Sequence, residues 1–67
     1  TDEYFGGKAG IVWGALHESR GMTITQLKRK TKLNDKELYA ALGWLACERK
    51  IDIQGDTPLL FRFALKE

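Results

Sequence analysis

The chain of 67 residues is long enough for one small domain with a single core, and too short for a domain built around a deep catalytic cleft. Hydrophobic residues make up 43% of the chain and charged residues 30%, which excludes an intrinsically disordered polypeptide. A net charge of +2 does not by itself indicate a polyanionic partner. The single cysteine excludes an internal disulfide, so we expect the protein in a reducing, cytoplasmic location.

A first helix is predicted from about Phe5 to Ser19. Apolar residues recur there at spacings of three and four, which is typical of a helix with one buried face. These residues are Phe5, Ala9, Val12 and Leu16, and Trp13 and Ala15 widen the face. Glycines at positions 6, 7, 10 and 14 weaken this helix, each by about 1 kcal/mol relative to alanine. Gly21 can adopt the left-handed conformation that ends it.

Residues 22–24 (Met-Thr-Ile) predict a short edge strand, and a second helix is expected from Thr25 to about Lys32. Thr25 would cap this helix by accepting a hydrogen bond from a free backbone N–H of the first turn. Leu27 is its inward-facing residue, and Leu33 directs an apolar side chain into the turn that follows.

A third helix is predicted from Asn34 to about Lys50. Asn34 and Glu37 have the spacing of a capping box, in which the cap side chain and the glutamate satisfy each other's backbone donors. The residues expected to face the core are Leu38, Ala41, Leu42, Leu45 and the stem of Arg49.

After the third helix the apolar period changes to two, which predicts a β-hairpin with one buried face. Ile51 and Ile53 alternate with polar residues on the first strand, and residues 55–58 (Gly-Asp-Thr-Pro) have the composition of a turn. The expected inward residues of the return strand are Leu59, Phe61, Phe63 and Leu65. The hairpin would complete the core, with Ile51, Ile53, Phe61 and Phe63 buried.

This order gives a mainly α fold with a small β-hairpin, as one domain over residues 1–67. Residues 24–27 (ITQL) and 33–45 (LNDKELYAALGWL) resemble the helix-turn-helix core of bacterial winged-helix proteins. The run 41–46 (ALGWLA), followed by ERKI, is similar to a small bacterial and archaeal winged helix-turn-helix family of uncharacterised function. The resemblance covers about residues 5–65 and implies three helices and a C-terminal wing. It carries over no active site, because the matching residues are core and turn positions.

A basic run occupies the second predicted helix and the turn after it: Lys28, Arg29, Lys30, Lys32 and Lys36. In helix-turn-helix domains these elements lie across the DNA backbone, where cations provide sequence-independent affinity by releasing counterions. Only Asp35 opposes the run locally. A solvated helix face without a partner is the alternative interpretation.

The third helix carries few side chains that could read a base sequence. Asn34 and Lys36 are the candidates for base contacts, and Tyr39 is expected on the same outward face of the helix. No Arg, Asn or Gln projects from the middle of the helix, so the usual partners of guanine and adenine are missing. The expected tip of the wing holds Asp56 and no cation, so Arg62 on the return strand is the nearest positive charge. Any DNA binding is therefore expected to have low sequence specificity.

The outer face of the third helix also has the composition of a protein interface, with small residues flanked by aromatic ones. This face consists of Tyr39, Ala40, Gly43, Trp44 and Cys47. Its composition favours a homodimer or a contact with another protein. The alternative is that Trp44 packs into its own core against the first helix.

The sequence predicts no catalytic residue, metal site, cofactor, small-molecule ligand or membrane contact. His17 is the only histidine, without a second ligand at metal-binding spacing, and no nucleophile and base form a recognisable pair. No apolar run approaches the roughly 20 residues that span a bilayer. Two functions remain: a DNA-binding module of low specificity, or a protein-interaction or dimerisation module that does not bind DNA.

Overall fold

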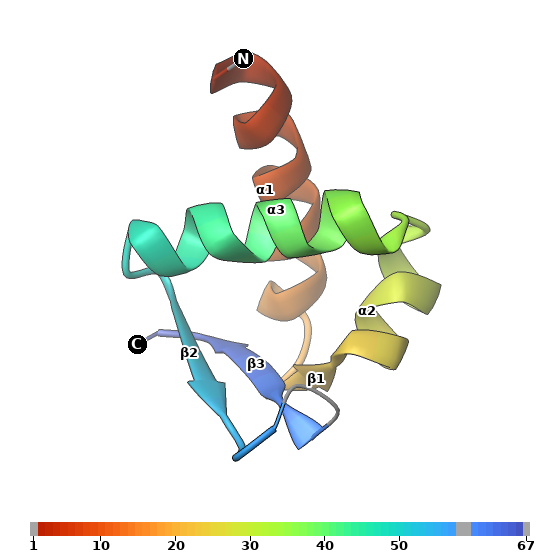
Figure 1. Cartoon of the computed structure of the whole chain (residues 1–67), viewed down its shortest axis with the longest axis vertical. Helices are drawn as coiled ribbons and strands as arrows, with labels where there is room; N and C mark the ends of the chain where they lie inside the picture. The colour runs from red at the N-terminus through yellow and green to blue at the C-terminus, as the bar shows by residue number, and fades with distance from the viewer. Residues whose placement is uncertain (1, 58–59, 67) are drawn as a thin grey trace.

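The computed structural model describes residues 2–57 and 60–66, which form three helices and a three-stranded antiparallel sheet. The elements in chain order are α1 (Asp2–His17), β1 (Met22–Thr23), α2 (Ile24–Thr31), α3 (Asp35–Cys47), β2 (Ile51–Gln54) and β3 (Arg62–Leu65). Figure 1 shows α3 lying across α1, α2 to one side, and the sheet at the end of the molecule opposite the N-terminus. The predicted mainly α fold with a hairpin is confirmed.

The sheet has the strand order β1-β3-β2, so the return strand of the hairpin lies in its centre. Met22 pairs with Phe63 on one side of β3, and Ile53 pairs with Phe63 on the other. The predicted edge strand is therefore real, although Ile24 belongs to α2.

One hydrophobic core joins all three helices to the sheet. Its buried residues are Ala9, Val12, Ala15, Leu16, Leu27, Leu33, Leu38, Ala41, Leu42, Leu45, Ile51 and Phe63. Four predicted core residues differ: Phe5, Trp13 and Ile53 are exposed, and Phe61 is only partly buried. Ile53 is 45% exposed because β2 is an edge strand that runs away from α3 toward the tip of the hairpin (Figure 1).

The first helix begins and ends earlier than its apolar period predicts. It starts at Asp2 and ends at His17, where the backbone N–H of Ser19 donates to the Leu16 carbonyl. Its glycine-rich first turns are helical because they pack against α3: Phe5 stacks on Trp44 with ring centroids 6.1 Å apart. Tertiary packing thus outweighs low intrinsic propensity, as is usual for helices of this length.

The second helix is capped by Thr23, so the prediction of Thr25 is wrong. The Thr23 hydroxyl accepts from the Gln26 backbone N–H at 3.3 Å, and the Gln26 side chain accepts from the Thr23 N–H at 2.9 Å. Only a cap at Thr23 places a glutamine at the third helical position, which completes a capping box. The helix ends at Thr31, one residue before the predicted Lys32.

The third helix ends at Cys47, three residues before the predicted Lys50. Arg49 adopts a left-handed conformation (φ 59°), and the Lys50 N–H donates back to the Leu45 carbonyl at 2.9 Å. This pattern satisfies the last free carbonyls of the helix. Arg49 therefore lies beyond α3 and is exposed, and its stem does not line the core.

The loop of the hairpin is longer than the sequence predicts, because β3 begins only at Arg62. Leu60 is exposed and its N–H donates to the Thr57 carbonyl at 2.9 Å. The predicted turn residue Pro58 and the predicted strand residue Leu59 lie outside the described residues.

Candidate functional site

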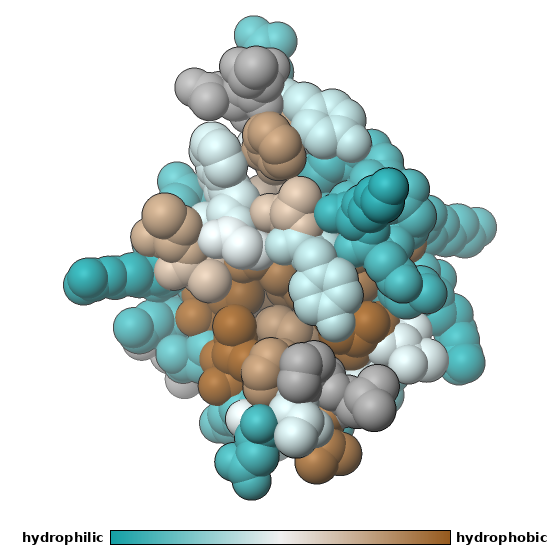
Figure 2. All heavy atoms as spheres, viewed as in Figure 1, coloured by the Kyte–Doolittle hydropathy of each residue, from teal (hydrophilic) through white to brown (hydrophobic). Residues whose placement is uncertain are grey.

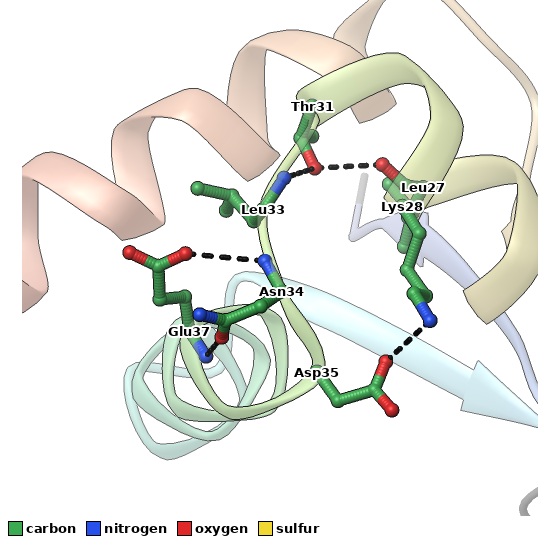
Figure 3. A network of polar contacts seen from close by, with 7 residues as sticks. All are labelled: Leu27, Lys28, Thr31, Leu33, Asn34, Asp35 and Glu37. Atoms are coloured by element: carbon green, nitrogen blue, oxygen red, sulfur yellow. Dashed lines mark hydrogen bonds and ion pairs between the residues drawn. The ribbon is translucent and has the colours of Figure 1, made fainter.

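The turn between α2 and α3 is held by one threonine side chain. The Thr31 hydroxyl donates to the Leu27 carbonyl at 2.7 Å and accepts from the Leu33 N–H at 3.3 Å (Figure 3). Lys32 adopts a left-handed conformation (φ 61°), and its N–H donates to the Lys28 carbonyl at 2.9 Å. The turn buries Leu33 against the core and leaves Lys32 exposed.

The start of α3 is held by the predicted capping box. The Asn34 side chain accepts from the Glu37 N–H at 2.8 Å, and Glu37 Oε1 accepts from the Asn34 N–H at 3.1 Å (Figure 3). The second oxygen of Glu37 pairs with Lys8 of α1 at 3.1 Å. The Asn34 backbone hydrogen bond, and then Lys8, lower the pKa of the Glu37 carboxyl from its usual value of 4.5.

This lowered pKa predicts a pH dependence of folding. A depressed pKa in the folded state adds stability above the unfolded value, and that stability is lost as the pH falls through the folded value. Glu37→Gln keeps an oxygen acceptor and removes the charge, so the variant should lose less stability than wild type as the pH falls through 4.5 and toward the lower pKa of the folded state. Urea unfolding at a series of pH values measures the difference. Equal acid sensitivity of the two proteins would show that Glu37 contributes no charge-dependent stability.

Two cations of the basic run are paired with carboxylates. Lys28 Nζ lies 2.8 Å from Asp35, and Lys30 Nζ lies 2.6 Å from Glu18 (Figure 3 shows the first pair). Glu18 follows the end of α1 and lies twelve residues before Lys30 in the sequence. Because α1 and α2 pack together, the two side chains meet, and the sequence alone does not reveal this ion pair. Lys30 lowers the pKa of the Glu18 carboxyl by hydrogen bonding and by its charge.

The other three cations of the run are exposed and form no ion pair with any residue in ranges 2–57 and 60–66: Arg29, Lys32 and Lys36. A shallow hollow at the turn is lined by Lys28, Asn34, Asp35 and Lys36. Hydrophilic side chains gather on the side of the molecule where α2 and this turn lie (Figure 2). The structure thus places the candidate cations on the helix-turn-helix. It also places Asp35 in the same hollow as Lys28 and Lys36.

Arg62 is held near the start of α2. Its guanidinium donates to the Gly21 carbonyl at 3.1 Å. Gly21 also lines a second hollow together with Arg29, so the two arginines lie near the same loop. We define the helix-turn-helix surface as Arg29, Lys32, Lys36 and the hollow at the turn.

The comparisons with known proteins identify this arrangement. Residues 1–62 match a family model described as a winged helix-turn-helix domain (DUF2582). The chain belongs to this winged helix-turn-helix family. A protein from Bacteroides thetaiotaomicron, solved by NMR in solution, is 36% identical and superposes with a TM-score of 0.83, over 96% of this chain and 77% of that one. The comparison with curated proteins found no match.

In this winged helix, α3 is the second helix of the helix-turn-helix, and its outer face is only weakly polar. Tyr39 is 47% exposed, Gly43 and Cys47 are exposed, and Ala40 is partly buried. Trp44 is turned toward α1, where it stacks on Phe5 and packs against the core. The predicted strip on α3 therefore reduces to Tyr39, Ala40, Gly43 and Cys47 at the surface.

The wing is the hairpin of β2 and β3 with its loop. Asp56 at its tip is exposed, as the sequence predicts. Over residues 2–57 and 60–66, no three metal-ligating side chains gather at one place, and none of the helices described there is long and apolar enough to cross a bilayer.

Proposed function

We propose that this winged helix is a non-enzymatic binding module that holds duplex DNA weakly through the helix-turn-helix surface. The observation that carries the proposal is the position of Arg29, Lys32 and Lys36: all three are exposed on or directly after the helices that flank the turn. Among the described residues no carboxylate pairs with these cations, which leaves them available to phosphates, and three such contacts give a salt dependence with a log–log slope of about −3. Lys28 and Lys30 must first leave Asp35 and Glu18, so they contribute less.

Low sequence specificity follows from the residues that α3 exposes. Phosphate contacts position a protein on DNA, whereas contacts with base edges specify a sequence. Beyond Asn34, Asp35 and Lys36 at its start, α3 exposes Tyr39, Gly43 and Cys47, none of which forms the two-hydrogen-bond contacts typical of base recognition. The acidic tip of the wing limits the affinity rather than the specificity, because Asp56 is exposed and repels phosphate.

Fluorescence anisotropy with a random-sequence duplex tests the proposal. We expect binding at about 50 mM salt that weakens at higher salt with a slope near −3. Arg29→Gln combined with Lys36→Gln should reduce the slope to about −1, since two phosphate contacts are lost. Arg49→Gln combined with Lys66→Gln lowers the net charge equally at exposed positions outside the helix-turn-helix, and should keep the wild-type slope.

A second function is favoured by the exposure of Tyr39, Gly43 and Cys47 on α3, which suits a contact with another protein. If the wild-type protein does not bind the duplex at about 50 mM salt, the DNA proposal is wrong. The protein-interaction module is then the remaining function.

A further inference from the structure

A hollow lies where the end of α1 meets β3. The short strand β1 pairs only with Arg62 and Phe63 of β3, so the rest of β3 faces the end of α1 and the loop that follows it (Figure 1). The space between them has a volume of about 680 Å³, which is within the range of small-molecule sites. The hollow is lined by Leu16, His17, Ser19, Arg20, Ala64, Leu65 and Lys66.

Both walls of this hollow are held by hydrogen bonds. On the side of α1, the Ser19 hydroxyl accepts from the Gly21 N–H at 3.3 Å. The Gly21 carbonyl in turn accepts from the Arg62 guanidinium at 3.1 Å, which ties the loop to β3. On the other side, the Lys66 N–H donates to the Lys50 carbonyl at 2.9 Å. The walls are therefore fixed in the free chain, as a preformed site requires.

The hollow carries an excess of positive charge. Arg20 and Lys66 are both exposed there, and within the described part of the chain neither forms an ion pair. None of the described residues that line the hollow is acidic. The end of α1 contributes about half a negative charge through the helix dipole, which two cations more than balance. An anion is therefore the complement of this hollow.

Two N–H groups add uncharged donors to the hollow. The Lys66 N–H points toward the chain before β2, where it donates to the Lys50 carbonyl. Backbone groups alternate in direction along a strand, so the Leu65 N–H points the other way, toward the hollow beyond the end of β1. His17 also lines the hollow, and a neutral imidazole still carries one N–H. A carboxylate accepts from such donors as well as from cations.

The floor of the hollow is apolar, because Leu16 is fully buried beneath it and Ala64 and Leu65 are partly buried. We infer that the hollow binds a small organic acid. Its carboxylate lies between Arg20 and Lys66, and its short apolar chain covers Ala64 and Leu65. A small inorganic anion would leave the apolar floor uncovered, and a neutral alcohol would leave the two cations without a partner. The hollow shares no residue with the helix-turn-helix surface, so this inference does not depend on DNA binding.

A titration of the isotope-labelled chain with hexanoate, followed by NMR at neutral pH, tests this inference. Concentrations up to about 20 mM bracket millimolar dissociation constants. The amide signals of Ser19, Arg20 and Leu65 should shift and reach saturation. Hexanol lacks the charge and acetate lacks the apolar chain, so at equal ionic strength each should bind about tenfold more weakly or less.

Two pairs of exposed cations provide matched variants for this titration. Arg20→Gln combined with Lys66→Gln should raise the dissociation constant for hexanoate about tenfold, because each exposed ionic contact contributes a few-fold. Arg29→Gln combined with Lys36→Gln removes the same charge at the helix-turn-helix surface and should leave hexanoate binding unchanged.

The inference is overturned if no amide signal saturates, or if hexanol or acetate binds as tightly as hexanoate. It is also overturned if the two double variants weaken hexanoate binding equally, since the cations of the hollow would then have no special role. These titrations contain no nucleic acid, so their failure and a failure of the proposed DNA binding are distinguishable.

Discussion

Leu42→Ala should destabilise the fold by about 2–5 kcal/mol, the usual cost of emptying a leucine position in a core. Leu42 is 3% exposed on the inner face of α3, beside the fully buried Leu38, and belongs to the one core that joins helices and sheet. In a domain of this size each kcal/mol shifts the melting temperature by about 4–8 °C, so the expected loss is at least about 8 °C.

Gly43→Ala is the matched control for this prediction, because it changes the next residue of the same helix. A Cβ at Gly43 meets no atom within 4 Å, so alanine should raise the stability by about 1 kcal/mol through its better helix propensity. Thermal unfolding followed by circular dichroism measures both variants at one low concentration. Similar melting temperatures for Leu42→Ala and wild type would mean that α3 presents another face to the core.

Gly55→Ala should cost about 1–3 kcal/mol, the range for a residue held in an unfavourable backbone conformation. Gly55 follows β2 with a φ of +121°, which side-chain-bearing residues rarely adopt. An alanine Cβ would lie 2.7 Å from the Leu60 carbonyl oxygen, a backbone atom that cannot move without shifting the loop. The wing would therefore have to open at its tip.

The neighbouring exposed residue provides the control. Asp56→Ala changes no buried group and no hydrogen bond between described residues, so its effect should stay within about 0.5 kcal/mol. Urea unfolding of both variants gives the two free energies. If Gly55→Ala unfolds at the wild-type urea concentration, the loop accommodates a Cβ and the positive φ is not required.

The amino-acid sequence determined the order of the elements and the start of α3. The apolar period of α3 and the capping box of Asn34 and Glu37 depend on residues at most four positions apart, so the local pattern was sufficient. The cap of α2 was also a local choice, but Thr23 and Thr25 both qualify as caps. Only the complete pair of hydrogen bonds with Gln26 decides for Thr23.

The tertiary structure decided which candidate residues are available at the surface. The pairing of Lys30 with Glu18 and the stacking of Trp44 on Phe5 join residues of different helices, which no local period can relate. The exposure of Ile53 depends on where α3 stops covering the sheet, although its alternation matches that of the buried Ile51. Periodicity reports which residues share a face, whereas burial and charge pairing depend on what the fold brings against that face.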